Sequence, residues 1–175
     1  MKPIRQGALD GLCGVYSLIN SLQIVQGTSF EESSRLFLEI LRAMEPRKKL
    51  SYLIENGMTD RDMAYVYREI IQKHYPVKVL KPFHNKADVP LKDYWETIQG
   101  FLEDGERRAV NLVLEGWDWG HWTVIQRATP KSLYLLDSAR MKRFDRRKCT
   151  TGRRLSRKRY FLILPRTTRF LFRKE

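Results

Sequence analysis

The sequence contains few cysteines and no long apolar run, and each absence excludes a class of protein. Two cysteines, Cys13 and Cys149, are too few for a disulfide framework, and without a CxxC pair or a Cys/His cluster we expect no structural zinc. No stretch of about 18 apolar residues is present, which predicts no membrane span. The first residues, MKPIRQGALDG, lack a continuous apolar core, so we expect no cleavable secretory leader. These absences favour a reducing, cytoplasmic location, although a protein exported as an effector without such a leader has the same features.

Basic charge is concentrated at the C-terminal end of the chain. The net charge is +13, and residues 140–175 contain 15 of the 33 Lys and Arg residues but only two of the 20 acidic ones. Such a segment forms a solvated face or attracts an acidic protein partner, nucleic acid or an acidic membrane surface. Its densest part, RRKCTTGRRLSRKR, has no interleaved aromatic residues for base stacking, which argues against nucleic acid.

The apolar content is sufficient for one core, and its spacing predicts helices before strands. The chain has 175 residues, 42% of them hydrophobic, which predicts a single domain over residues 1–175. Helical spacing predicts helices at 11–25, 29–44, 48–55, 59–73 and 91–103. Alternating or β-branched runs predict strands at 77–80, 109–114, 121–127, 132–137, 159–164 and 168–172. We therefore expect an α+β fold, with an N-terminal helical lobe and a C-terminal, mostly antiparallel sheet.

Two residues have the chemistry of a nucleophile and its base. Cys13 opens the first predicted helix, where the helix dipole and unpaired backbone N–H groups favour the thiolate. His121, in Gly120-His121-Trp122, begins a predicted strand, where a base can face a helix N-terminus across a cleft. Taken alone, a cysteine is more often a small buried side chain and a histidine an ordinary core residue.

Two further residues complete the set. Asp137 follows His121 by 16 residues and ends the next predicted strand, so a tight turn brings the two side by side, and the carboxylate can orient the imidazole. Gln6 precedes Cys13 by seven residues, and its amide can donate to an oxyanion together with the Cys13 backbone N–H. The order Gln, Cys, His, Asp is the pattern expected of a thiol hydrolase.

With these four motifs the chain resembles the papain-like cysteine peptidase superfamily. The resemblance extends over nearly the whole chain as an order of motifs, and over about three short windows as matching text. It implies a helical lobe that carries Cys13, a β lobe that carries His121 and Asp137, an active site in the cleft between them, and Gln6 with the Cys13 amide as the oxyanion hole.

The text is most similar to branches that process ubiquitin and its relatives. Gln6…Asp-Gly-Leu-Cys13-Gly and His121-Trp…Leu-Asp137-Ser are similar to segments of the adenain-type enzymes, which place His and Asp before Cys. Josephin-type deubiquitinases have the present order but Asn in place of Asp137, and ovarian-tumour-type enzymes share Asp-Gly-x-Cys. Bacterial papain-fold effectors and bacteriocin-leader peptidases share the order with looser text. The Cys-Gly-Ser-Cys-Trp text of the cathepsins is absent. The motifs do not choose among the remaining branches.

Small and aromatic residues beside the motifs are candidates for substrate binding. We expect Gly14 to leave room for a substrate backbone, and Trp119, Gly120 and Trp122 to form a narrow apolar channel for a slim chain such as Gly-Gly. Trp117 is interpreted as a core or lid aromatic. The basic stretch 140–159 follows Asp137 and is expected to be able to border the cleft.

The sequence therefore predicts a cysteine peptidase that cleaves a peptide or isopeptide bond of a protein or peptide substrate without a metal or organic cofactor. Three alternatives stay open. In the first, the same triad performs glutamine deamidation or acyl transfer. In the second, the chain is an inactive papain fold that binds an acidic partner or nucleic acid through its basic C-terminus. In the third, it is a hydrolase that uses this basic segment to find its substrate. Cys149 lies in the basic stretch, where neighbouring charge favours reactivity.

Overall fold

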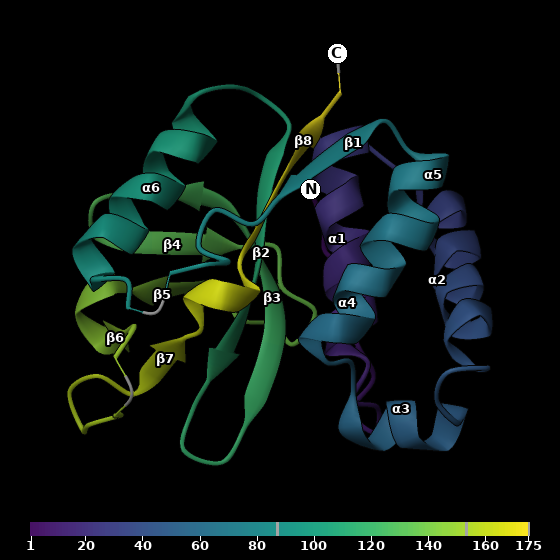
Figure 1. The fold of residues 1–175 in the computed structure, drawn as a ribbon, viewed down its shortest axis with the longest axis horizontal. Helices are drawn as coiled ribbons and strands as arrows, with labels where there is room; N and C mark the ends of the chain where they lie inside the picture. Colours follow the sequence, from purple (N-terminus) through teal and green to yellow (C-terminus); the bar gives the residue numbers. More distant parts are fainter. Residues whose placement is uncertain (87, 153, 175) are drawn as a thin grey trace.

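A computed structural model describes residues 1–86, 88–152 and 154–174, and it shows one antiparallel-dominated sheet with helices on both faces (Figure 1). The helices are α1 (Cys13–Gln26), α2 (Phe30–Met44), α3 (Leu50–Asn56), α4 (Asp60–Val66), α5 (Gln72–His74) and α6 (Leu91–Glu103). The strands are β1 (Val77–Leu80), β2 (Arg108–Glu115), β3 (Gly120–Ala128), β4 (Ser132–Leu135), β5 (Arg143–Asp145), β6 (Cys149–Thr150), β7 (Phe161–Ile163) and β8 (Arg169–Arg173). The predicted α+β class is thus confirmed.

The strands run in the order β1-β8-β2-β3-β4-β5, and β7 pairs with β2 and, in parallel, with β6. The helices α1 to α5 lie on one side of this sheet and α6 lies on the other (Figure 1). Side chains alternate along β3, so Trp122 and Val124 pack toward α1 while Ile125 packs toward α6. Each face therefore covers its own apolar core.

Local signals explain the helix boundaries in the first half. Ser29 begins α2 with a reciprocal capping box to Glu32, as the sequence indicates. Thr59 forms the same arrangement with Asp62 at the start of α4. The predicted helix over 59–73 is a single helical run, in which a five-residue π-helical turn (Tyr67–Ile71) separates α4 from α5.

Two parts of the predicted strand pattern need correction. The strand over 132–137 ends at Leu135, because the Asp137 carboxylate turns back to accept from the backbone N–H groups of Ala139 and Met141. Strands β5 and β6 were not predicted. They are three and two residues long and lie within the charged stretch, where so few residues give no clear alternation.

Candidate active site

Cys13 is the first residue of α1, and this end of the helix lies beside the start of β3. The loop before it is fixed by Asp10, whose Oδ1 accepts from the Leu12 backbone N–H at 3.0 Å while its Oδ2 accepts from Gly7 at 2.9 Å. The Cys13 sulfur accepts from the Trp122 backbone N–H at 3.5 Å. The thiol is therefore held between a helix N-terminus and the first residues of β3, where backbone donors favour negative charge on sulfur.

Two glycines set how closely the Cys13 loop approaches the end of α3. The Gly11 N–H donates to the Ile54 carbonyl at 2.6 Å, and a Cβ on Gly11 would lie 2.7 Å from that oxygen. Gly57 has a left-handed φ of +68°, and a Cβ there would lie 2.7 Å from the Gly11 carbonyl oxygen. Both positions accept only glycine, because any side chain would push the two backbones apart.

His121 lies in the second position of β3 and contacts both predicted partners. Its Nε2 is 2.6 Å from Asp137 Oδ2, which leaves Nδ1 as the ring nitrogen available to Cys13. Burial opposes protonation of the ring, which is 9% exposed. The hydrogen bonds and negative charges of Asp137 and Cys13 outweigh that effect and raise the pKa of His121 to about 9. The imidazolium is thus favoured at neutral pH.

Asp137 is 2% exposed, and its carboxylate oxygens accept four hydrogen bonds. Oδ2 contacts His121 and accepts from the Thr123 hydroxyl at 2.7 Å, while Oδ1 accepts from the Ala139 and Met141 backbone N–H groups, each at 2.9 Å. Burial favours the neutral acid, but His121, Thr123 and the Met141 N–H more than offset it and lower the pKa of Asp137. A satisfied carboxylate of this kind holds a histidine ring in one orientation.

Gln6 lies beside the cysteine, and its side chain is engaged within its own loop. Its Nε2 donates to the Asp10 carbonyl, and its Oε1 accepts from the Ser138 hydroxyl at 3.4 Å. The Gln6 backbone N–H also donates to the Ser138 carbonyl at 3.3 Å, which connects the N-terminal loop to the residue after Asp137. Gln6 and Cys13 line the same cleft, but in this structure the Gln6 amide donates to the Asp10 carbonyl.

Of the four other residues that the sequence suggests for substrate binding, two line the cleft and two do not. Gly120 and Trp122 line the cleft, and the Trp122 indole donates to the Met58 carbonyl at 2.8 Å. Gly14 is buried away from the lining, and a Cβ there would lie 2.9 Å from the Met58 Cβ, so its small size serves helix packing. Trp119, 40% exposed, lies over Gly116 and packs edge-on against Phe161 at 6.1 Å between ring centroids, outside the cleft lining.

The cleft has a volume of about 430 Å³ and lies between the Cys13 loop, the α3–α4 connection and the ends of β2 and β3. Its charged side chains, apart from His121, are acidic: Glu55, Asp60 and Glu115. Asp60 is neutralised by Arg169 at 2.6 Å and Lys81 at 2.9 Å. Within the described chain, Glu55 and Glu115 form no ion pair, so the free charge of the cleft is negative.

Sequence reasoning missed a buried cation under this cleft. Arg169, 1% exposed, donates to the carbonyls of Asp60 and Thr167 as well as to the Asp60 carboxylate, and its guanidinium lies 5.6 Å from the centre of the Trp122 ring. Asp60, Thr167 and Trp122 all line the cleft, so Arg169 fixes its floor. Nothing in the sequence around Arg169, which lies in the strongly basic segment 140–175, indicates that this arginine is buried. Thr123 was also missed, although a hydroxyl residue two positions after the histidine shares its strand face.

Two expectations about the basic segment are wrong. None of the described residues of 140–159 lines the cleft. In this stretch β5 pairs with β4 at the edge of the sheet, and β6 pairs with β7. Cys149 is fully buried, and burial raises the pKa of its thiol to about 12, so it is protonated and unreactive at neutral pH.

Within the described residues, no group of three or more His, Cys, Asp or Glu side chains is placed to hold a metal ion. No helix of this part of the chain is both long and apolar enough to cross a membrane. No protein-family model, no curated protein and no solved structure matches this chain. The geometry of Cys13, His121 and Asp137 is therefore the feature that points to a function.

Proposed function

We propose that the chain is a papain-like thiol hydrolase that cleaves a peptide or isopeptide bond through Cys13, His121 and Asp137. One observation carries the proposal. A cysteine at a helix N-terminus contacts a buried histidine, and the second ring nitrogen of that histidine is held at 2.6 Å by a fully hydrogen-bonded carboxylate. A structural role for the cysteine alone would not require the histidine and carboxylate to be buried in this arrangement.

The reaction follows from the roles of these groups. His121 holds the proton of the Cys13 thiol, and the thiolate attacks the carbonyl carbon of the scissile bond. The oxyanion forms beside the Cys13 backbone N–H and the Gln6 amide, once that amide leaves the Asp10 carbonyl. His121 gives its proton to the leaving amine as the C–N bond breaks, which produces a thioester. Water, deprotonated by His121, then attacks the thioester and restores the thiol with release of the acid.

Asp137 positions the ring and does not touch the substrate. Its bond to Nε2 keeps Nδ1 toward the sulfur, and its charge stabilises the imidazolium through the whole cycle. Thr123 and the two backbone donors keep the carboxylate in place. The His121 proton is therefore retained until the leaving group takes it.

The first test is the rate of alkylation of each cysteine at neutral pH, followed by peptide mass spectrometry. We expect Cys13 to react with iodoacetamide faster in the folded protein than in the unfolded chain, because the neighbouring imidazolium favours the nucleophilic thiolate, and to lose this reactivity in His121→Ala. Cys149 is the internal reference and stays unmodified in the folded protein. Slow alkylation of Cys13, unchanged by His121→Ala, would overturn the proposal.

The second test identifies the reaction with substrates and separates the alternatives. Ubiquitin-like probes and peptide libraries are incubated with the protein and with Cys13→Ala, and the products are analysed by mass spectrometry. Cleavage supports hydrolysis. Ammonia release from an intact protein would identify a glutamine deamidase, and transfer to an added amine would identify an acyltransferase, because only the group that clears the thioester differs.

A further inference from the structure

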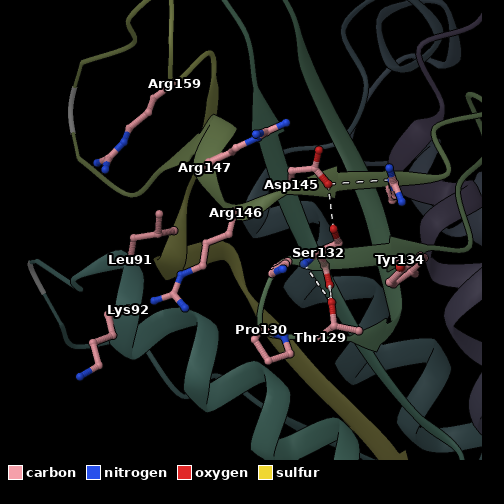
Figure 2. Close-up of a pocket in the computed structure, with 12 residues that line it drawn as sticks. Leu91, Lys92, Thr129, Pro130, Ser132, Tyr134, Asp145, Arg146, Arg147 and Arg159 are labelled. Carbon is pink, nitrogen blue, oxygen red and sulfur yellow. Dashed lines mark hydrogen bonds and ion pairs between the residues drawn. The ribbon is translucent and has the colours of Figure 1, made fainter.

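A second cavity, of about 1000 Å³, lies at the far edge of the sheet, between β5, the β3–β4 turn and the start of α6 (Figure 2). We call it the basic pocket. Six of its lining residues are cations: Lys92, Lys131, Arg143, Arg146, Arg147 and Arg159. Asp145 is the one acid among the described residues of the lining; it accepts from the Ser132 hydroxyl at 2.7 Å and lies 3.9 Å from Arg143. Within the described chain, the other five cations form no ion pair with a carboxylate.

Three cations from separate parts of the chain border the side of the pocket near α6. Figure 2 shows Arg146 extending from the 3-10 turn after β5 toward Leu91 and Lys92, with Arg159 on the loop opposite. Arg147 points away from Arg146 in the same view. Because like charges repel, a fold that brings Lys92, Arg146 and Arg159 to one concave surface loses free energy unless an anion binds between them.

Buried contacts lie beneath this region. The Arg146 guanidinium lies 5.8 Å from the centre of the buried Trp95 ring, and the Trp95 indole donates to the Thr129 carbonyl at 2.7 Å. The first turn of α6 lies beside it and has no side-chain cap at Pro90, so its backbone N–H groups add a partial positive charge, which the exposed Asp93 in the same turn partly offsets. The backbone of Arg159 lies in a turn, in which its backbone N–H donates to the Ser156 hydroxyl at 3.0 Å.

We propose that the basic pocket binds a small ligand that carries several phosphate groups. Arginine forks match phosphate oxygens in paired hydrogen bonds, and the convergence of cations from three directions suits a compact polyanion better than an extended acidic chain. Single-stranded nucleic acid fits less well, because Tyr134 is the one aromatic residue among the described residues of the lining, and the Arg127 guanidinium, 3.6 Å from the ring centre, covers one of its faces. The site is independent of Cys13.

The test is titration calorimetry with inorganic tripolyphosphate. We work in about 0.1 M salt, where exposed charges more than about 10 Å apart are screened. The probe is expected to bind one per chain. Lys92→Glu/Arg159→Glu should weaken binding by at least about 10-fold, since each lost cation removes charge-assisted hydrogen bonds. Both residues are exposed, so this variant is expected to fold. Arg146→Gln, which keeps hydrogen-bonding capacity without the charge, is the second variant.

The matched control is Arg35→Glu/Arg42→Glu, which makes the same change in net charge on exposed residues of α2, on the other side of the sheet from α6 and outside the pocket lining (Figure 1). Its affinity for tripolyphosphate should change by less than about 3-fold at this salt. Equal weakening by the control and the pocket variant would show attraction to the overall charge and overturn the proposal. Failure of tripolyphosphate to bind, with or without binding of a hexaglutamate peptide or a DNA duplex in parallel titrations, would overturn it as well.

Discussion

The cleft at Cys13 and the basic pocket are both lined by strands of the same sheet, but the charges that line them are opposite in sign. The cleft has Glu55 and Glu115 as its free charges, whereas the basic pocket has six cations and one acid. A net charge of +13 therefore describes neither site alone. The C-terminal segment supplies the pocket with arginines, whereas beneath the cleft it places one buried arginine, Arg169, which is paired with Asp60. Burial and pairing decide what charge a site presents.

The largest effect should separate the two sites completely. Cys13→Ala is expected to lower hydrolysis by at least about 10⁴-fold, because no other group forms the thioester, while tripolyphosphate binding stays unchanged. Turnover and calorimetry on the same preparation measure both. Cys149→Ala is the control. It should keep activity and lose about 1–2 kcal/mol of unfolding free energy from the cavity left in the core. Retained activity in Cys13→Ala would remove the catalytic half of the comparison.

A smaller effect should come from Asp137→Asn. The amide oxygen can still accept from His121 Nε2, but it carries no charge to stabilise the imidazolium. We therefore expect kcat to fall by part of the general acid–base contribution of about 10²- to 10⁴-fold, and by less than in Cys13→Ala. The alkaline limb of the pH profile should also move to lower pH, since the charge that raises the His121 pKa is gone. A loss as large as that of Cys13→Ala would show that Asp137 does more than position the ring.

The same pair makes stability depend on pH. His121 has a folded pKa of about 9, above its unfolded value of about 6.5. Its contribution, at most about 3 kcal/mol, is therefore fully present below about pH 6.5 and is lost as the pH rises through 9. Urea unfolding between pH 6 and pH 10 should show this decline in the native protein and a smaller one in His121→Gln. Parallel declines in both proteins would assign the pH dependence to other groups.

The smallest effect concerns substrate preference and tests the negative charge of the cleft directly. Glu115→Gln should lower kcat/KM for peptides with Lys or Arg near the scissile bond by about 3- to 10-fold, and should spare neutral peptides, because one partly exposed charge pair contributes little. Peptide-library profiling at low and high salt measures it. Asp93→Gln, an exposed acid outside the cleft lining, is the matched control. An unchanged preference would mean that Glu115 does not contact the substrate.

Much of this arrangement was predictable from the sequence, because its signals are local. The capping box at Ser29 and the alternation of the strand beginning near His121 each depend on a few adjacent residues. Asp137 and His121 are placed together by one strand turn, which spacing also indicates. The order of the four motif residues added the hypothesis of a thiol hydrolase.

The features that were missed depend on contacts between distant segments. Arg169 is 109 residues from Asp60, and no local pattern indicates that this arginine, among many exposed ones, is buried. Lys92 and Arg159 are brought to one cavity only when α6 packs across the sheet. The internal bond of the Gln6 amide to Asp10 depends on loop geometry, so sequence indicated the donor but not the direction in which it points.

The contact between Gly11 and Gly57 has a consequence for how this site can change in evolution. An alanine at Gly11 would collide with the Ile54 carbonyl oxygen, and an alanine at Gly57 with the Gly11 carbonyl oxygen, and no side-chain substitution can remove either oxygen. Neither glycine can therefore be replaced with the help of a second, compensating substitution. A redesign that widens the cleft has to lengthen one of the two loops, because exchanging side chains leaves this backbone spacing as it is.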